Sequence, residues 1–345
     1  MSDTYFLEHV LKNKLPMASE VEVHLFELCN LRCHFCGQDH DDRTGFDSVV
    51  LKADKALEFI SKSTSKNHIV NIMGGEIFND ELSDDIFNDY LQFAKKINDY
   101  VVAKSETCVF NWVSNLIFAK RERVQFFLNS LSAENIQWNI STSYDFTGRK
   151  NSLWKKEIFH FNLELFKERI YTIGFVLTKE SVAALLKDDD EYFKHLYLHY
   201  PLYFDFYVPE NGANRLMPSD RDILDAYLFI AKNYPKINPV SDLLKNSQNK
   251  MTCYSMNKTT ILPDGQEVKC RYMQYDANSF NHEVNYSSNV NIIEAHLEEN
   301  QCLSCEWFER CSFRCFVQAD WAKREKMPEC IFKTFFQEVR AWNLL

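Results

Sequence analysis

The stretch CNLRCHFC at residues 29–36 decides the fold expected for this chain. Its cysteines are spaced Cys-x3-Cys-x2-Cys and follow a strand-like run, Glu20–Leu28, in which polar and apolar residues mostly alternate. A structural zinc ion or a closed iron–sulfur cluster takes four protein ligands. The three thiolates of Cys29, Cys33 and Cys36 would leave one metal position open, and an open position is where another molecule can bind and react.

The composition excludes several classes of protein. The chain has 345 residues, of which 46% are hydrophobic and 26% charged, so we expect a large core and no long disordered tract. A net charge of −10 and a pI near 5.5 argue against general nucleic-acid binding and against binding to anionic membranes. The N-terminus lacks a signal peptide, and no apolar run approaches about 20 residues. We therefore expect a cytoplasmic protein with no membrane partner.

The eleven cysteines indicate metal binding. The cytosol keeps thiols reduced, so metal ligation explains many cysteines better than disulfides do. Three of them lie at 29–36 and seven lie at 253–330, and only Cys108 falls between. The clustering predicts two metal-binding regions, with Cys108 as a core residue.

Strand-like and helix-like segments alternate through the first 210 residues, which predicts an α/β fold. The expected strands are Glu20–Leu28, His68–Met73, Thr107–Val113, Ile136–Thr142, Arg169–Leu177 and Leu202–Val208. Repetition of strand and helix implies a parallel sheet covered by helices, and six units are too few for a closed eight-stranded barrel. We therefore expect an open, partial (β/α)6 TIM-like barrel.

Four segments are expected along the chain. Residues 1–19 form an N-terminal extension, 20–215 the partial barrel and 216–245 a bridging helix and linker, with Ser219 as the helix N-cap. Residues 246–345 form a small cysteine-rich α+β domain that contains a hairpin with an Asp264-Gly265 turn and closes with a C-terminal helix.

The triplet of cysteines after the first strand resembles the radical S-adenosylmethionine (radical SAM) enzymes, and Phe35 matches the aromatic residue that this family has before its third cysteine. The resemblance implies that Cys29, Cys33 and Cys36 hold a [4Fe–4S] cluster whose fourth iron is chelated by S-adenosylmethionine. Reductive cleavage of that cofactor would give a 5′-deoxyadenosyl radical, which abstracts a hydrogen atom. The alternative for the triplet alone is a zinc-knuckle fragment or three unrelated thiols.

Weaker matches extend the resemblance. Gly74-Gly75-Glu76 ends the second strand. In the family this motif binds the methionyl amino group. The residue types suit that role, because glycines allow close backbone approach and a carboxylate can receive an ammonium group. Ile77 stands where the family often has proline. Asn115 and Ser143, at the ends of the third and fourth strands, resemble cofactor-contacting positions. Taken singly, these residues also fit ordinary turns and caps.

The seven C-terminal cysteines resemble the SPASM domain, which carries two auxiliary [4Fe–4S] clusters. By that resemblance Cys302, Cys305, Cys311 and Cys330 close a distal cluster. Cys253, Cys270 and Cys315 hold a nearer cluster, whose remaining iron is open or takes a non-cysteine ligand such as Asp242 or a substrate group. A double zinc ribbon is the alternative.

SPASM enzymes mostly act on peptides, so the leading hypothesis is radical modification of a peptide or protein side chain. It implies an external electron donor of the flavodoxin or ferredoxin type and, with about 20 residues before the first strand, a separate leader-binding protein. A small molecule or a modified nucleotide is the alternative substrate. Sulfatase maturation is disfavoured, because Arg271 stands where those enzymes have an aspartate base; Tyr272 and Asp276 are nearby substitutes. A non-catalytic metal-cluster scaffold is the alternative of a different class.

Overall fold

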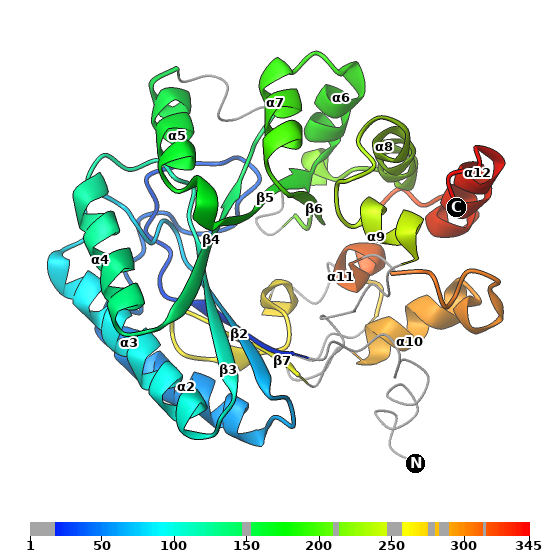
Figure 1. The fold of residues 1–345 in the computed structure, drawn as a ribbon. Helices are drawn as coiled ribbons and strands as arrows, with labels where there is room; N and C mark the ends of the chain where they lie inside the picture. The colour runs from blue at the N-terminus through cyan, green and yellow to red at the C-terminus, as the bar shows by residue number, and fades with distance from the viewer. Residues whose placement is uncertain are drawn as a thin grey trace.

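The computed structural model describes residues 18–146, 153–209, 214–246, 257–274, 280–282, 290–312 and 315–345. Its centre is a curled eight-stranded sheet of order β6-β5-β4-β3-β2-β1-β7-β8. Figure 1 shows this sheet between an outer row of helices, α2 to α5, and the C-terminal elements α10 and α11. The strands are β1 Ser19–His24, β2 Asn67–Met73, β3 Thr107–Val113, β4 Gln137–Ser143, β5 Ile170–Leu177, β6 Leu202–Phe206, β7 Lys258–Ile261 and β8 Glu267–Val268.

Helices follow the first six strands and continue into the C-terminal region. The α-helices are α2 Val49–Lys62, α3 Asp84–Ala103, α4 Arg121–Ala133, α5 Leu153–Leu165, α6 Lys179–Lys187, α7 Glu191–His199, α8 Asp220–Asn233, α9 Val240–Lys245, α10 Val290–Glu299, α11 Phe316–Asp320 and α12 Ile331–Ala341. Short 3-10 turns include η2 Phe46–Ser48, η3 Lys167–Arg169, η4 Asn214–Leu216, η5 Arg271–Gln274 and η7 Cys302–Ser304. Within the described ranges, every helix is too short or too polar to cross a bilayer.

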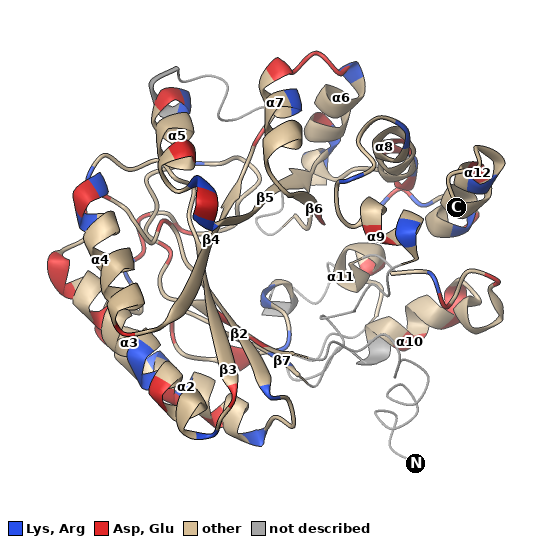
Figure 2. Cartoon of the chain, viewed as in Figure 1, with Lys and Arg blue, Asp and Glu red and all other residues tan. Residues whose placement is uncertain are grey.

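The six expected strands and the partial barrel are confirmed. β1 to β6 are all parallel, and each neighbouring pair in sequence is also a neighbouring pair in the sheet. Side chains on the outer face of β1, Val21 and Val23, have no solvent exposure, whereas Glu20 and Glu22 on the inner face are partly exposed. The outer face therefore forms the apolar core under the helices, and Figure 2 shows charged residues of both signs distributed along the helices that cover it.

The hairpin at residues 258–268 has the expected form and an unexpected position. Gly265 has a φ of 84°, which favours glycine, and β7 and β8 pair antiparallel. β7 also pairs in parallel with β1, so the hairpin extends the barrel sheet to eight strands. Sequence patterns did not indicate this pairing, because β1 and β7 are separated by more than 230 residues along the chain.

Helix α8 connects the barrel to the end of the chain. Ser219 is its N-cap as expected, since the Ser219 hydroxyl accepts from the Asp222 N–H and the Asp222 carboxylate accepts from the Ser219 N–H. The ring of Tyr227 on α8 packs edge-on against Phe332 and Phe335 of α12. The C-terminal helix is thus part of the same apolar core as the barrel helices.

Candidate functional site

The cysteine loop lies at the carboxyl end of β1, the edge at which active sites of barrel enzymes are built. The Cys29 N–H donates to the carbonyl of His40 at 2.9 Å, and the Cys36 N–H donates to the carbonyl of Cys33 at 3.0 Å. All three cysteines are partly buried, and none of the described cysteines is in a disulfide. Backbone hydrogen bonds therefore hold the three thiols on one short loop above the sheet.

Gly74 and Gly75 allow two backbone segments to pack closely. β1 ends at His24, four residues before the expected end, and the following segment runs beside residues 73–76. The Gly75 N–H donates to the carbonyl of Phe26 and the Glu76 N–H to that of Leu28, each at 2.8 Å. A Cβ on Gly75 would lie 2.0 Å from the Leu28 carbonyl oxygen. The close approach that needs glycine is thus to the segment leading into Cys29, which fixes the Gly-Gly-Glu motif against the cysteine loop.

The Glu76 carboxylate is a buried hydrogen-bond hub with no solvent exposure. It accepts from the Ser114 hydroxyl and the Asn115 N–H, both at 2.6 Å, and from the Phe78 N–H at 2.9 Å. These donors follow β2 and β3, so one carboxylate joins the ends of two strands. A role for Glu76 toward a cofactor amino group remains a prediction.

Asn115 extends this hub to the cysteine loop. Its amide nitrogen donates to Asn30 Oδ1 at 2.8 Å and lies 3.8 Å from Cys29 Sγ. Gln38 Nε2 donates a second hydrogen bond, of 2.9 Å, to the Gly74 carbonyl, which also connects the cysteine loop to the Gly-Gly-Glu motif. Sequence reasoning missed Asn30 and Gln38, because their partners lie 85 and 36 residues away.

The chemistry of the three thiols fits a cluster. Burial and the nearby Glu76 charge raise the pKa of Cys29 to about 12, and Cys33 and Cys36 act in the same direction, which places the three side chains within electrostatic reach of one another. A bound metal stabilises thiolates against such an environment. Within the described residues, no group of three or more Cys, His, Asp or Glu side chains is arranged to hold a single metal ion. In a cubane cluster each thiolate binds its own iron.

Phe35 and Ser143 are the two remaining cofactor-contacting candidates. Phe35 packs against a second apolar cluster, which includes Tyr207 and Met217. Ser143 is the last residue of β4 and is partly exposed. It pairs in register with Gly174 of β5, at the same edge of the sheet as the cysteine loop. Both cofactor contacts remain predictions.

Four C-terminal cysteines are brought together from two segments of the chain, 302–311 and the residues around 330. Cys302, Cys305, Cys311 and Cys330 line one cavity of about 310 Å³, together with His296 and Lys333. Four thiols in the wall of one cavity are a donor set that fits a [4Fe–4S] cluster. Their ligation remains a prediction.

The second C-terminal set is described only in part. Cys270 and Cys315 are partly buried and pack against the second apolar cluster. Cys253 lies outside the described residues, as does Asp276, and Asp242 lies on α9. Cys108 is a core residue as expected: it is 4% exposed, and burial raises its pKa to about 12.

Polar side chains line the inner face of the barrel, in contrast to the branched apolar layers that fill closed barrels. Lys258 Nζ lies 3.3 Å from Glu20 Oε1 and 3.2 Å from Glu22 Oε2. A chain of amides continues across the sheet: Asn71 donates to Glu20 at 2.9 Å, and Asn111 donates to Asn71 at 2.9 Å. We call this inner face, with the residues that point into it, the lumen.

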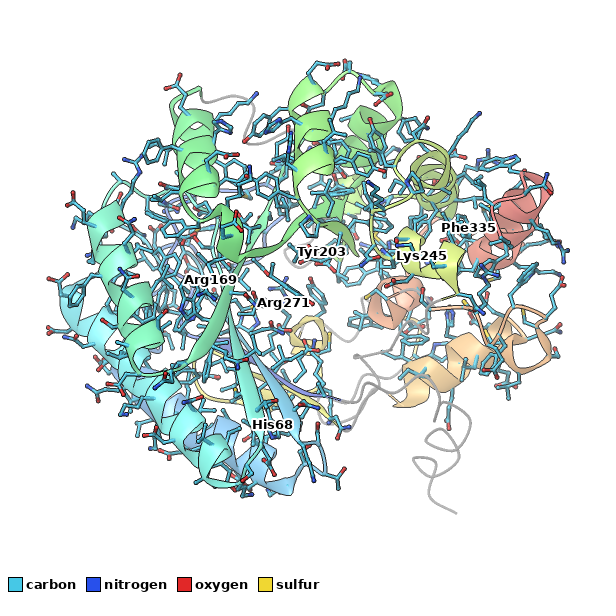
Figure 3. The ribbon with its side chains drawn as sticks, in the orientation of Figure 1. His68, Arg169, Tyr203, Lys245, Arg271 and Phe335 are labelled. Carbon is cyan, nitrogen blue, oxygen red and sulfur yellow. The ribbon has the colours of Figure 1, made fainter. Side chains whose placement is uncertain are left out.

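Arg271 enters the lumen from η5, directly after Cys270. Its guanidinium group packs on the ring of Tyr272 and donates to the Tyr272 hydroxyl at 2.8 Å. In Figure 3 the labelled Arg271 and Tyr203 both lie in the space between the sheet and the C-terminal region. The charge of Arg271 acts on two carboxylates of distant strands, Glu22 on β1 and Asp205 on β6: burial raises the pKa of Asp205 and Arg271 opposes that rise, while at Glu22 it adds to the lowering by Lys258 and His24.

The curled, parallel-dominated sheet is a fold that solved radical SAM enzymes also have. Among solved structures, the chain is similar to anSMEcpe, an anaerobic sulfatase-maturating enzyme of that class. Native anSMEcpe with bound AdoMet and the Cp18Cys peptide matches with a TM-score of 0.62 and 16% identity over 95% of this chain and 98% of that chain.

Two further anSMEcpe structures agree. The complex with AdoMet and the Kp18Cys peptide matches with the same TM-score, identity and coverage, and native anSMEcpe with AdoMet alone has a TM-score of 0.60 over 94% of this chain. No family model and no curated protein matches the sequence. At 16% identity the likeness establishes a shared fold, so the fold implied by the sequence resemblance is confirmed.

Proposed function

We propose that this protein is a radical SAM enzyme that abstracts a hydrogen atom from a peptide or protein side chain. The observation that carries the proposal is the arrangement at the carboxyl ends of β1 to β3. There a three-cysteine loop, the Gly-Gly-Glu motif and Asn115 are connected by hydrogen bonds into one unit. The fold shared with anSMEcpe, which binds AdoMet and a peptide in its solved structures, supports the same reading.

Different residues of this unit would bind the cluster, position the strand ends and contact the cofactor. Cys29, Cys33 and Cys36 would bind a [4Fe–4S] cluster and leave its fourth iron for S-adenosylmethionine. When bound to a reduced cluster, S-adenosylmethionine supplies the radical that removes the hydrogen atom. Glu76 keeps the strand ends in register, and Asn115 places an amide beside Cys29 Sγ. Ser143 and Phe35 would also contact the cofactor.

The C-terminal region would hold two auxiliary [4Fe–4S] clusters. The cavity lined by Cys302, Cys305, Cys311 and Cys330 would take the distal one. Cys253, Cys270 and Cys315 would take the nearer one, with one position left for Asp242 or a substrate group. Reduction would come from a flavodoxin- or ferredoxin-type donor, and substrate delivery from a separate leader-binding protein.

Sulfatase maturation is the second candidate, because the similar solved structures are of a sulfatase-maturating enzyme. Arg271 argues against it, since a guanidinium group cannot serve as the base that the aspartate of those enzymes provides. A small-molecule or nucleotide substrate and a non-catalytic scaffold are the remaining alternatives.

Anaerobic reconstitution tests the proposal. Three [4Fe–4S] clusters predict about twelve irons per chain and 5′-deoxyadenosine formation under reduction. Replacing Cys29, Cys33 and Cys36 by Ala should abolish cofactor cleavage and retain about eight irons. A colourless protein that holds only zinc would contradict the enzyme proposal and favour the scaffold.

A further inference from the structure

Lys52 on α2 is a buried ammonium group with a full set of hydrogen-bond acceptors. Its side chain is 1% exposed. Nζ donates to the carbonyl of Leu25 at 3.2 Å, to the carbonyl of Gly45 at 3.2 Å and to the hydroxyl of Ser48 at 2.9 Å. Burial lowers the pKa of Lys52 to about 8 against the attraction of Asp264, so the protonated form with its three N–H donors still predominates at pH 7. Three donors thus meet three acceptors, which is the condition for burying such a charge.

The acceptors of Lys52 lie on both sides of the three cysteines. Leu25 precedes the first cysteine, and its N–H donates to the carbonyl of Met73 at 2.8 Å, so it is fixed to the edge of the sheet. Gly45 and Ser48 follow the third cysteine and lead into α2. The Ser48 N–H donates to the Gly45 carbonyl at 3.1 Å, which makes these two acceptors one compact turn. The ammonium group therefore joins the end of the cysteine loop to the segment from which the loop starts.

The packing around Gly45 shows how tightly these two ends are joined. Gly45 has a φ of 100°, and a Cβ there would lie 2.2 Å from the Leu25 carbonyl oxygen and 2.7 Å from the Pro263 carbonyl oxygen. Pro263 belongs to the turn between β7 and β8, so the hairpin of the C-terminal region packs at the same point. Beside it, the rings of Phe26 and Phe46 meet edge-on with their centroids 4.6 Å apart. The two ends of the loop are thus in contact through backbone, ammonium and aromatic groups.

We propose that Lys52 is a positioning residue that closes the cysteine loop and so holds its three thiols in place for a cluster. The inference rests on the proposed function and adds a residue that acts on the same site through the ends of the loop. A side chain of similar length without N–H donors would leave the Leu25 and Gly45 carbonyls without the charge that joins them. The loop would then open locally while the rest of the barrel stays folded.

Hydrogen exchange on the full-length chain before reconstitution tests the inference. In Lys52→Met, backbone amides of residues 29–48 should exchange about tenfold faster than in the wild-type protein, the size of one hydrogen bond to a charged group, and those of α3 should not change. Lys52→Arg, which keeps the charge and the donors, should restore part of the protection. Lys62→Met is the matched control. It removes an exposed lysine of the same helix, whose partner is Glu58, and should exchange like the wild-type protein.

Two results would overturn the inference: unchanged exchange of residues 29–48 in Lys52→Met, or an equal rise in α3, which would mean a general loss of stability. If Lys52→Met does not fold, acetylation of the wild-type protein decides. A cluster that keeps the loop closed should slow acetylation of Lys52 about tenfold and leave that of Lys62 unchanged. Equal acetylation of Lys52 with and without the cluster contradicts the inference. The exchange measurement needs no cluster, so iron content and 5′-deoxyadenosine formation after reconstitution test the proposed function separately.

Discussion

The two cysteine-rich regions are built in different ways. Around Cys29 the backbone itself makes the site, since segments 25–28 and 73–76 exchange hydrogen bonds and Glu76 ties the next strand to them. Around Cys302 and Cys330, a 3-10 turn and a helix end meet at a cavity. The first site is formed by backbone at the ends of the sheet strands, whereas the second is formed by loops and turns. We therefore expect the first region to keep its shape without metal and the second to need it.

Cysteine replacements test this difference most strongly. Cys33→Ala and Cys330→Ala should each lose about four irons per chain, because one [4Fe–4S] cluster is lost in each. Cys330→Ala should also lower the melting temperature of the reconstituted protein by more than Cys33→Ala does. Iron analysis and thermal unfolding measure both effects. Cys108→Ala is the control and should keep all the iron; equal melting temperatures for the two test variants would contradict the comparison.

Gly75→Ala probes the backbone contact of the first region. The new Cβ would collide with the Leu28 carbonyl, so we expect a loss of about 3 kcal/mol in the free energy of unfolding. Gly265→Ala is the matched variant. It has room around its Cβ but a φ of 84°, and it should lose about 1 kcal/mol. Urea denaturation gives both values. A larger loss for Gly265→Ala than for Gly75→Ala would show that the close approach of Gly75 to Leu28 does not constrain the motif.

Glu22→Gln tests the charged lumen between the two regions. Burial acts to raise the pKa of Glu22, but Lys258, His24 and Arg271 outweigh it and hold the pKa well below its usual value of 4.5. The unfolded chain thus binds more protons than the folded one below about pH 5, so this stabilisation is present above 4.5 and is lost as pH falls through the folded pKa.

The expected result follows from the lowered pKa of Glu22 in the folded protein. Glu22→Gln should be less stable than the wild-type protein by about 2 kcal/mol at pH 6, and the difference should shrink as the pH falls toward 3. Urea titrations at several pH values measure it. Glu122→Gln, at an exposed position on α4, should follow the wild-type curve at every pH. A pH-independent difference for Glu22→Gln would exclude the lumen ion pairs as its cause.

Ser219→Ala gives the smallest expected effect. It removes the N-cap of α8, the helix on which α12 packs, and α12 begins directly after Cys330. We expect a loss of about 1 kcal/mol in stability and no loss of iron, because the cap acts on the helix and not on the thiols. Ser219→Asp should restore the stability. A loss of iron in Ser219→Ala would mean that the second site depends on α8 itself.

The sequence predicted those features that depend on residues close together in the chain. Alternating residues predicted six parallel strands, the cysteine spacings predicted two regions, and Ser219 predicted a cap. The pairing of β7 with β1 could not be predicted, because both segments are compatible with many partners. The same holds for Glu76, two of whose donors lie nearly 40 residues away. Both features depend on three-dimensional proximity.

The most direct test of the central claim is electron–nuclear double resonance on the reduced, reconstituted protein with S-adenosylmethionine labelled with ¹⁷O in its carboxylate. Ligation of the open iron above Cys29, Cys33 and Cys36 predicts a clear ¹⁷O coupling that disappears in Cys33→Ala and persists in Cys330→Ala. No coupling in the wild-type protein, or a coupling that follows Cys330 instead, would contradict the assignment of the cofactor to the loop after β1.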